Sequence, residues 1–535
     1  MRIWSVSREY AGLAEAGGVK NVARSLCVTL TELGHKVRLF IPLYGCSDIS
    51  RVGNYREDCA PAAEITVMGR RERVRFDSGI IDGVKVVFIR HPGFLCKRAV
   101  YVYTDDDERE NPAHRKGVGH EDAQFLNVLF QKAMVVYGAR RWKKAPDIIH
   151  CHDATCAMIP AFIQAVDVLQ SKINGLARTR CLVTIHNAGP GYHHDFASVD
   201  EAERCTGLPR ALLEKGLSGR RVEPFLLAAG CGAELSTVSP RYAEELRERQ
   251  NDALTDGLAR EFIARGIHVT GITNGIDALS YDPTDSSKSL LPFEYNPLAK
   301  NFSGKFLLRE YFESVQSRAA SGDLACGVPV EGTGLVQYGC LAPASEKEMP
   351  VYFAYHGRMV HQKGVDILCA AAQIVLERCQ SARFVIVGQG APELEQAAVR
   401  LASRYAGKCV YFNGYDRAFC RLCTAACDFM VLPSNFEPCG LEDLIASCLG
   451  TVPVAHATGG LTKIIHGQTG FLYRPNTPQT LAALLLQLAD KEHSVPRSFY
   501  NVVQAAADYA HTEFSWRRTA EKYYVPLFRR MCRSL

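Results

Sequence analysis

The sequence predicts an α/β protein with two doubly wound parallel sheets. Short β-branched or apolar runs alternate with longer helical patterns along nearly the whole chain, and a long break separates these runs into two sets. Such alternation is typical of βαβ units, whose parallel strands are covered by helices on both faces. We therefore expect two α/β domains joined by a linker.

Eleven runs have the composition of buried strands, and most of them end in polar or glycine residues. The first set occupies residues 36–43, 84–89, 147–153, 181–187, 234–239 and 268–275. The second set occupies residues 351–358, 383–390, 409–415, 428–434 and 451–456. These sets predict an N-terminal domain over residues 1–280 and a C-terminal domain over residues 351–496.

Three further segments lie outside these strands and their helices. Residues 281–350 mix Ser, Gly and Pro with one helical piece and predict a linker that contains an irregular insertion near 316–350. Residues 104–122 are polar and predict a mobile loop. Residues 497–535 predict a helical tail.

The composition indicates a globular protein that is long enough for two or three domains. Its 535 residues are 47% hydrophobic and carry a formal net charge of +5, which is too small to favour a nucleic-acid partner. The basic run at 140–144 is expected at a helix C-terminus. The chain starts without an apolar leader, and no apolar stretch approaches the roughly 18 residues of a membrane span. We therefore expect a cytoplasmic protein.

The 20 cysteines are expected to be reduced thiols in this setting. Cys420, Cys423 and Cys427 follow an i, i+3, i+7 spacing, which describes one buried face of a helix. Zinc is the alternative for this group, but no second pair of ligands stands nearby in the sequence. We expect structural thiols and no metal.

Polar side chains gather where the expected strands end. They are Asp153, His186, Asn187, Asn274, Arg358, Ser434 and Glu437. A single polar residue at a strand end is usually a cap. Because ligands of open α/β sheets bind beyond the carboxyl ends of the strands, so many together predict a ligand site.

Arg358 and Lys363 stand five residues apart in "HGRMVHQKG", across an expected turn. An arginine fork and a lysine point charge can together bind a diphosphate. Taken alone, the motif favours two solvated cations in a loop over a diphosphate site.

The segment 433–461 favours the ligand interpretation. Glu437 precedes Cys439, Gly440 and Leu441 at an expected helix start, and a Gly-Gly turn follows the next strand. Free backbone N–H groups at a helix start can bind phosphate, while a carboxylate can bind sugar hydroxyls. The alternative is a helix cap, because Glu is favourable in a first turn.

A second anion site is expected near the start of the chain, in "AEAGGVKNVARSL" (14–26). Gly17 and Gly18 precede a helical run, and small residues at a helix N-terminus allow close approach of an anion. Glu15, itself an anion, stands two positions before these glycines.

The ordered set of motifs resembles the bacterial glycogen synthase and plant starch synthase family. The matching segments are "EAGGVKNV", "HCHD", "TIHN", "TVSPRYAEEL", "GITNGID", "GRMVHQKGVDIL", "PSNFEPCGL", "GTVPVAHATGGL" and "FSWRRTAEKYY". They cover nearly the whole chain. No single segment is specific, but their order and spacing are.

The resemblance implies a GT-B fold, with two Rossmann-like domains facing a central cleft and a C-terminal helix that crosses back to the first domain. It implies transfer of glucose from ADP-glucose to the 4-hydroxyl at the non-reducing end of an α-1,4-glucan such as glycogen. It also implies retention of the anomeric configuration and no cofactor or metal.

The resemblance also assigns roles to residues. Arg358 and Lys363 would hold the diphosphate, and Glu437 would bind hydroxyls of the transferred glucose. Asp153 and His186 would line the sugar pocket, and Asn274 would approach the same ring. Tyr415 would lie near the nucleotide base. The other donor-binding candidates are Glu15, Gly17, Gly18, Lys20, Cys439, Gly440, Leu441 and Glu442.

These roles agree with the chemistry of breaking a glycosyl–phosphate bond, which places negative charge on the diphosphate and positive charge on the sugar ring. Fixed cations beside the diphosphate stabilise that charge. A cleft that closes also excludes water, which prevents hydrolysis of the donor.

The chain departs from the family pattern at positions that touch the expected site. Glu15 replaces the family lysine, and Glu442 replaces a small hydroxyl or neutral residue. Leu227 replaces another lysine, and Ala154 replaces an aromatic residue. Unit charges about 4 Å apart interact with about 4 kcal/mol at an effective dielectric constant of 20, so the two acids are expected to weaken diphosphate binding.

Three explanations of these acids stay open. Lys20, which opens the same helix, could supply the cation lost at Glu15. The preferred donor could have changed, for example to UDP-glucose. Activity could also be impaired.

Three alternative functions follow from the same residues. One is a related GT-B enzyme with a lipid or cell-surface acceptor. Another is a non-catalytic glucan-binding homologue, which is disfavoured by the joint presence of the five catalytic candidates Arg358, Lys363, Glu437, His186 and Asp153. A dinucleotide-dependent dehydrogenase is excluded, because Gly388 and Gly390 lack the third glycine of that loop.

Overall fold

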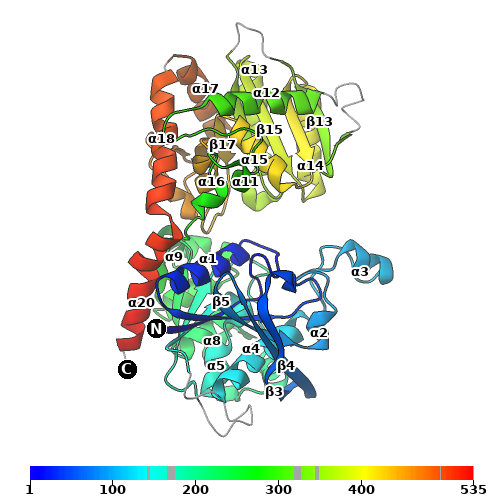
Figure 1. Ribbon diagram of the computed structural model, residues 1–535, viewed down its shortest axis with the longest axis vertical. Coiled ribbons are helices and arrows are strands. Elements are labelled where there is room, and N and C mark those ends of the chain that lie inside the picture. The colour runs from blue at the N-terminus through cyan, green and yellow to red at the C-terminus, as the bar shows by residue number, and fades with distance from the viewer. Residues whose placement is uncertain (141–144, 166–174, 318–326, 344–348, 495, 534–535) are drawn as a thin grey trace. The chain divides into compact units, whose positions relative to one another are not determined.

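The computed structural model describes residues 1–140, 145–165, 175–317, 327–343, 349–494 and 496–533. The chain divides into two compact units, each with its own sheet (Figure 1). Unit 1 comprises Met1–Thr273 and Thr519–Leu535, and unit 2 comprises Asn274–Arg518. The C-terminal segment thus belongs to the unit in which the chain begins.

Unit 1 contains a nine-stranded sheet with the order β11-β10-β7-β6-β1-β2-β5-β4-β3. Seven neighbouring strands are parallel: β11 (Val269–Gly271), β10 (Glu234–Thr237), β7 (Arg180–Ile185), β6 (Ile148–His152), β1 (Arg2–Val6), β2 (Lys36–Pro42) and β5 (Val84–Arg90). The antiparallel strands β4 (Arg70–Ile81) and β3 (Gly53–Val67) extend one edge. A separate short pair joins β8 (Leu217–Ser218) to β9 (Arg221–Val222).

Helices cover both faces of this sheet, as expected for a doubly wound fold. Figure 1 shows α1 on one side of the strands and α4, α5 and α8 on the other. The helices are α1 (Val19–Glu32), α2 (Pro92–Leu95), α3 (Asp105–Glu110), α4 (Ala123–Ala139), α5 (Ile159–Gln164), α6 (Val199–Thr206), α7 (Arg210–Leu213), α8 (Pro224–Gly230), α9 (Pro240–Glu245) and α10 (Leu258–Ala264). α4 is buried along nearly its whole length, because most of its residues are apolar and its buried Gln131 and Lys132 are hydrogen-bonded.

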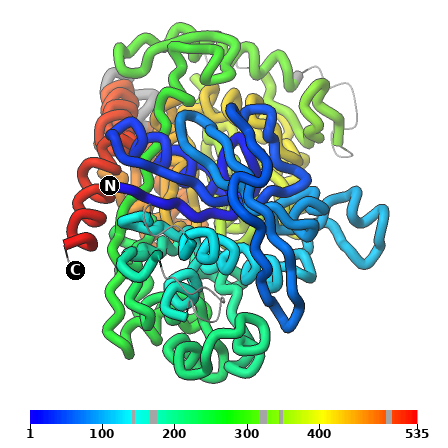
Figure 2. Tube along the Cα trace, turned by 60° about the horizontal axis from the view of Figure 1, so that its bottom comes forward, coloured from blue at the N-terminus to red at the C-terminus, as the bar shows by residue number. Residues whose placement is uncertain are grey.

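The C-terminal helix α20 (Val525–Arg533) lies beside the N-terminal strand in both views (Figures 1 and 2). A π-helical turn, Ala520–Tyr524, leads into it. The rings of Tyr524 and Phe528 lie 5.6 and 6.1 Å from the ring of His150 on β6. These apolar contacts attach the chain's end to the core of unit 1.

Unit 2 contains an eight-stranded sheet with the order β12-β13-β16-β15-β14-β17-β18-β19. Its strands are β12 (Val328–Val330), β13 (Leu335–Leu341), β14 (Val351–His356), β15 (Ala382–Gly388), β16 (Lys408–Asn413), β17 (Phe429–Leu432), β18 (Val452–His456) and β19 (Phe471–Tyr473). β12 and β13 pair antiparallel at one edge, and the strands from β16 to β19 are parallel.

The helices of unit 2 pack around this sheet. They are α11 (Ser286–Ser289), α12 (Ser303–Ser317), α13 (Val365–Arg378), α14 (Pro392–Arg404), α15 (Arg417–Ala426), α16 (Glu442–Cys448), α17 (Pro478–Ser494), α18 (Pro496–Glu513) and α19 (Trp516–Thr519), the last of which ends in unit 1. The helical tail predicted at 497–535 is thus divided between the two units.

All eleven predicted strands are present, and both sheets are parallel in the predicted regions. The prediction of an irregular insertion near 316–350 is wrong for part of this segment, because β12 and β13 form an antiparallel hairpin there. The predicted loop 104–122 contains α3, whose start is fixed by a capping box between Thr104 and Asp107. Arg140 follows the last turn of α4, and the rest of the basic run, 141–144, lies outside the described residues.

Cys420, Cys423 and Cys427 are buried in the core of unit 2, as predicted. Every cysteine that the structure describes is a free thiol. None of the helices in the described ranges combines the length and the apolar character needed to span a membrane.

Candidate active site

The predicted site residues fall into two groups, one in each unit. Asp153, His186, Glu15, Gly17, Gly18 and Lys20 belong to unit 1. Asn274, Arg358, Lys363, Tyr415, Glu437, Cys439, Gly440, Leu441 and Glu442 belong to unit 2. Asn274 was expected in the first domain, but the chain changes unit directly before it. Each group is described on its own.

The Gly-Gly segment of unit 1 already binds a carboxylate of the chain. Glu9 is buried, with 2% of the residue exposed. Its Oε2 accepts hydrogen bonds from the N–H groups of Gly17 (2.6 Å) and Ala16 (3.2 Å). The predicted anion site is therefore occupied by Glu9. Burial raises the pKa of this carboxyl, while the N–H donors oppose that rise.

Glu15 is neutralised by Lys20, the neighbouring cation in the first turn of α1. Lys20 Nζ lies 2.7 Å from Glu15 Oε2, and Glu15 Oε1 accepts a hydrogen bond from the N–H of Gly12 at 2.7 Å. The helix α1 begins at Val19, with Gly18 as its N-cap. Lys20, in the first turn of α1, thus forms a direct ion pair with Glu15 beside Gly17 and Gly18.

Asp153 follows β6 in a backbone conformation that L-residues rarely adopt, with φ 62° and ψ 178°. This region is essentially restricted to glycine, and such strain occurs mostly at functional sites. Its carboxylate Oδ1 accepts a hydrogen bond from the N–H of His186 at 2.7 Å. Burial and the nearby charge of Glu9 raise the pKa of Asp153 to about 7.

His186 is connected to a chain of buried polar groups. Its Nε2 lies 3.0 Å from Nδ1 of His152, and Nε2 of His152 lies 3.2 Å from the hydroxyl of Ser5. Burial lowers the pKa of both imidazoles, that of His152 to about 3, so both rings are neutral at pH 7. His152 therefore fixes the orientation of the His186 ring, and leaves Nδ1 of His186 for a ligand.

In unit 2, Lys363 and Glu437 form the central pair of the site. Lys363 Nζ lies 2.5 Å from Glu437 Oε2, which also accepts a hydrogen bond from the hydroxyl of Ser434 at 3.1 Å. Both side chains are partly exposed, at 22% and 16%. The pair is thus accessible to a ligand that carries both a negative charge and hydroxyl groups.

Hydrogen bonds between two loops hold this pair together. The N–H of Asn435 donates to the carbonyl of Gln362, and Asn435 Nδ2 donates to the carbonyl of His361. Gln362 Nε2 in turn donates to the carbonyl of Phe436. The turn that carries Lys363 and the loop that carries Glu437 are therefore one rigid surface.

Two glycines allow these loops to approach closely. A Cβ at Gly364, which has φ +66°, would lie 1.9 Å from the carbonyl oxygen of Pro433. A Cβ at Gly460 would lie 1.7 Å from the carbonyl oxygen of Cys439. Lys463 adds donors to the same loop: its Nζ binds the carbonyls of Cys439 and Gly440 and the carboxylate of Asp443.

Glu442 and Asn274 complete this surface. Glu442, in the first turn of α16, lies 2.8 Å from Nε2 of His356. Asn274 is 3% exposed, and its side-chain oxygen is buried without a hydrogen-bond partner in the described structure. Its backbone N–H donates to the sulfur of Cys439, whose pKa burial raises to about 11. An unsatisfied buried oxygen of this kind is a candidate acceptor for a ligand hydroxyl.

Two predicted site residues, and one position that departs from the family pattern, are not fixed by these contacts. Arg358 follows β14 and is exposed, which leaves its guanidinium accessible. Tyr415 is 65% exposed beyond the end of β16. Leu227, at a position where the family has a lysine, is fully buried in α8.

The sequence does not identify three further residues, one in unit 1 and two in unit 2. Glu9 binds the N–H groups of Ala16 and Gly17, His356 contacts Glu442, which is 86 positions away, and Lys463 contacts Cys439, which is 24 positions away. A carboxylate close to a Gly-Gly pair is the one sequence signal that could have identified Glu9.

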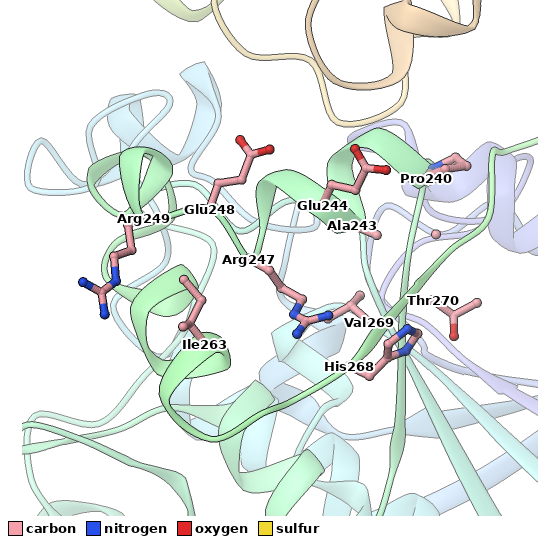
Figure 3. A pocket seen from close by; sticks show the side chains of 11 residues that line it. Pro240, Ala243, Glu244, Arg247, Glu248, Arg249, Ile263, His268, Val269 and Thr270 are labelled. Atoms are coloured by element: carbon pink, nitrogen blue, oxygen red, sulfur yellow. The ribbon is translucent and has the colours of Figure 1, made fainter.

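A hollow of about 740 Å³ in unit 1 lies apart from the predicted residues (Figure 3). It lies beside the edge strand β11. The charged and titratable side chains that line it include Glu244, Arg247, Glu248 and His268. Among the described residues, no group of three or more His, Cys, Asp or Glu side chains could hold a metal ion.

Comparison with known proteins identifies the same family as the motifs do. Residues 2–261 match the family model described as starch synthase catalytic domain, and residues 350–491 match glycosyl transferases group 1. Glycogen synthases from Thioalkalivibrio sulfidiphilus and Moorella thermoacetica are each 28% identical, over 98% and 99% of this chain and equal shares of their own.

Solved structures support the same fold. The catalytic domain of starch synthase IV from Arabidopsis thaliana, bound to ADP and acarbose, matches with a TM-score of 0.79 at 24% identity, covering 99% of both chains. Sucrose-phosphate synthase from Thermosynechococcus elongatus matches with a TM-score of 0.55 at 15% identity, covering all of both chains. The two sheets, the ordered motifs and these matches together show that the chain is a hexosyltransferase with a GT-B fold and belongs to the glycogen synthase and starch synthase family.

Proposed function

We propose that this chain transfers glucose from ADP-glucose to the non-reducing end of an α-1,4-glucan, with retention of configuration, in the cytoplasm. The observation that carries the proposal is the Lys363–Glu437 pair, held by two bonded loops next to the exposed Arg358. The names of the relatives and the ADP and acarbose bound to starch synthase IV support the choice of donor and acceptor.

In this proposal the cations of unit 2 bind the diphosphate. Lys363 is a point charge and Arg358 a fork of donors, and both stabilise the negative charge that grows on the leaving nucleoside diphosphate. Glu437 accepts hydrogen bonds from hydroxyls of the transferred glucose, and its bond to Lys363 keeps the lysine in place. The proposal includes no metal, because these two side chains supply the positive charge.

Other residues bind the sugar. Asn274 offers a buried acceptor that has no partner within the described part of the chain. In unit 1, Asp153 and His186 are joined by a hydrogen bond of 2.7 Å and have atoms left for hydroxyl groups. We propose that the strained backbone of Asp153 is retained because it presents this carboxyl to the glucose.

The test is the transfer of labelled glucose into glycogen from ADP-glucose and from UDP-glucose, measured side by side. We expect ADP-glucose to be the better donor and β-amylase to release the label as maltose, which places new α-1,4 bonds at the non-reducing ends. Label found in a lipid extract and not in glycogen would contradict the proposal. A preference for UDP-glucose would overturn the donor alone.

A further inference from the structure

The contact between His356 and Glu442 has a chemical consequence for the donor site. His356 ends β14, and Glu442 begins α16. Nε2 of His356 and Oε2 of Glu442 lie 2.8 Å apart. An imidazole nitrogen without a proton and a carboxylate oxygen are both acceptors, so they repel each other at this distance. One of the two groups must therefore carry a proton at this contact.

The other ring nitrogen shows where the imidazole's own proton is. Nδ1 of His356 lies 3.2 Å from the hydroxyl of Thr424. That hydroxyl donates its hydrogen to the carbonyl of Cys420, at 2.9 Å. It can therefore only accept from His356, which places a proton on Nδ1. The proton at Nε2 is then a second one, and the pair holds a charged imidazolium and a carboxylate with no net charge.

The surroundings of the pair agree with this assignment. Glu442 raises the pKa of His356 against its burial, and His356 together with Lys363 and Arg421 lowers the pKa of Glu442. Arg421 is anchored away from the pair on the carbonyls of Ser280, Lys288 and Ser289. The other titratable groups that face the pair are Tyr281, Tyr355 and Cys420, which are all neutral at pH 7 because burial raises each pKa.

We propose that His356 is a positioning residue of the nucleotide-sugar site: it holds Glu442 in a neutral pair, so that Arg358 and Lys363 keep their full attraction for the diphosphate. This inference rests on the proposed function. It also explains how the chain tolerates an acid at position 442, because the charge of Glu442 is cancelled by a residue at the end of the neighbouring strand.

Loss of the second proton would leave Glu442 as an uncompensated anion beside Lys363. The Michaelis constant for the donor would then rise, while the turnover number at saturating donor would change little. Because Glu442 is 37% exposed, screening by water limits the effect to about threefold to tenfold.

Three variants test this, with His268→Gln, an exposed histidine of unit 1, as the matched control. His356→Gln is expected to raise the donor KM about threefold to tenfold. Glu442→Gln is expected to lower the donor KM, because it removes an acid from beside Lys363. The double variant His356→Gln/Glu442→Gln is expected to return the KM to that of the wild type. A purely structural role for His356 would not allow this rescue.

A second readout is the pH dependence of the donor KM between pH 6 and 9. ADP-glucose suits this measurement, because its diphosphate diester does not titrate in that range. The wild type is expected to show a KM that rises with pH as the pair loses its proton, and Glu442→Gln is expected to lack this rise. An unchanged KM in His356→Gln, or no rescue in the double variant, would overturn the inference.

Calorimetric binding of ADP-glucose without acceptor, with UDP-glucose in parallel, separates this inference from the proposed function. If the variants change binding as expected but no glucose reaches glycogen, the proposed function fails and the role of His356 stands. If glucose is transferred but binding is the same in all variants, the inference fails alone. If neither sugar nucleotide binds the wild type, both are contradicted.

Discussion

Lys363 and Glu437 are the closest pair of opposite charges that the two bonded loops of unit 2 bring together, with Nζ and Oε2 2.5 Å apart. One side chain comes from the turn after β14 and the other from the loop after β17. The acid keeps the lysine at a fixed place, and both remain partly exposed. This arrangement suits a site that must recognise charge and hydroxyl groups together.

The variant Glu437→Ala should lose most of its activity and keep its fold. We expect kcat to fall by about 10²-fold or more, because the acid both binds sugar hydroxyls and orients Lys363. A partly exposed pair contributes only about 1 kcal/mol to stability, so the melting temperature should stay within a few degrees. Initial rates and calorimetric melting check this, and wild-type turnover in the variant would contradict the role of Glu437.

The raised pKa of Asp153 predicts that the free energy of unfolding depends on pH. Its folded pKa of about 7 lies above the ordinary value, so the folded state holds this proton more tightly than the unfolded chain does. The contribution of Asp153 to the free energy of unfolding therefore falls as pH rises from about 4 to about 7, by up to about 4 kcal/mol. Above pH 7 it is constant.

The variant Asp153→Asn should remove this fall in the free energy of unfolding with rising pH. We expect its melting temperature to exceed that of the wild type at pH 8 and to equal it near pH 4, while glucose transfer falls at both values. Melting curves of the two proteins across this range check the sign. A variant that is less stable at pH 8 would show that Asp153 is ionised and stabilising in the fold.

The Glu15–Lys20 pair predicts the effect of changing the charge at the start of α1. Lys20→Ala removes the cation that lies 2.7 Å from the Glu15 carboxylate, and the donor KM should rise about threefold. Glu15→Lys places two cations there, and the donor KM should fall by a similar factor. Arg24→Ala, which removes the Arg24–Asp82 pair from the same helix, is the matched control. Equal KM values in all three variants would show that this pair lies away from the donor.

The sequence predicts eleven of the parallel strands, but it misses the short parallel strands β1 and β19 and the antiparallel hairpins β3–β4 and β12–β13. Runs such as 351–358 and 383–390 contain four or five consecutive apolar residues, because their strands are buried on both faces. The hairpin β3–β4 was missed for two reasons. Arg and Glu occupy many of its exposed positions, and the pairing register between its strands shifts at bulges. The hairpin β12–β13 was missed because glycines interrupt its short strands.

The sequence also reveals the acids of the site but not all of their partners. Glu15 and Glu442 stand out as departures from the family pattern, and Lys20 is close enough in the chain to be suggested as a compensating cation. His356 is 86 residues from Glu442, and only the parallel pairing of β14 with β17 explains why the two elements that carry them are neighbours. The occupation of the Gly17 N–H by Glu9 depends in the same way on how a loop folds back.

The most direct test of the account is the transfer of labelled glucose from ADP-glucose to glycogen by the wild type and by Lys363→Ala, with Lys36→Ala, an exposed lysine of β2, as the matched control. We predict that the wild type and the control elongate glycogen at equal rates. Lys363→Ala should be about 10²- to 10³-fold slower in kcat, with its melting temperature retained. Equal turnover in all three proteins, or no transfer by the wild type, would contradict the assignment of this chain as a glucan synthase that works through Lys363.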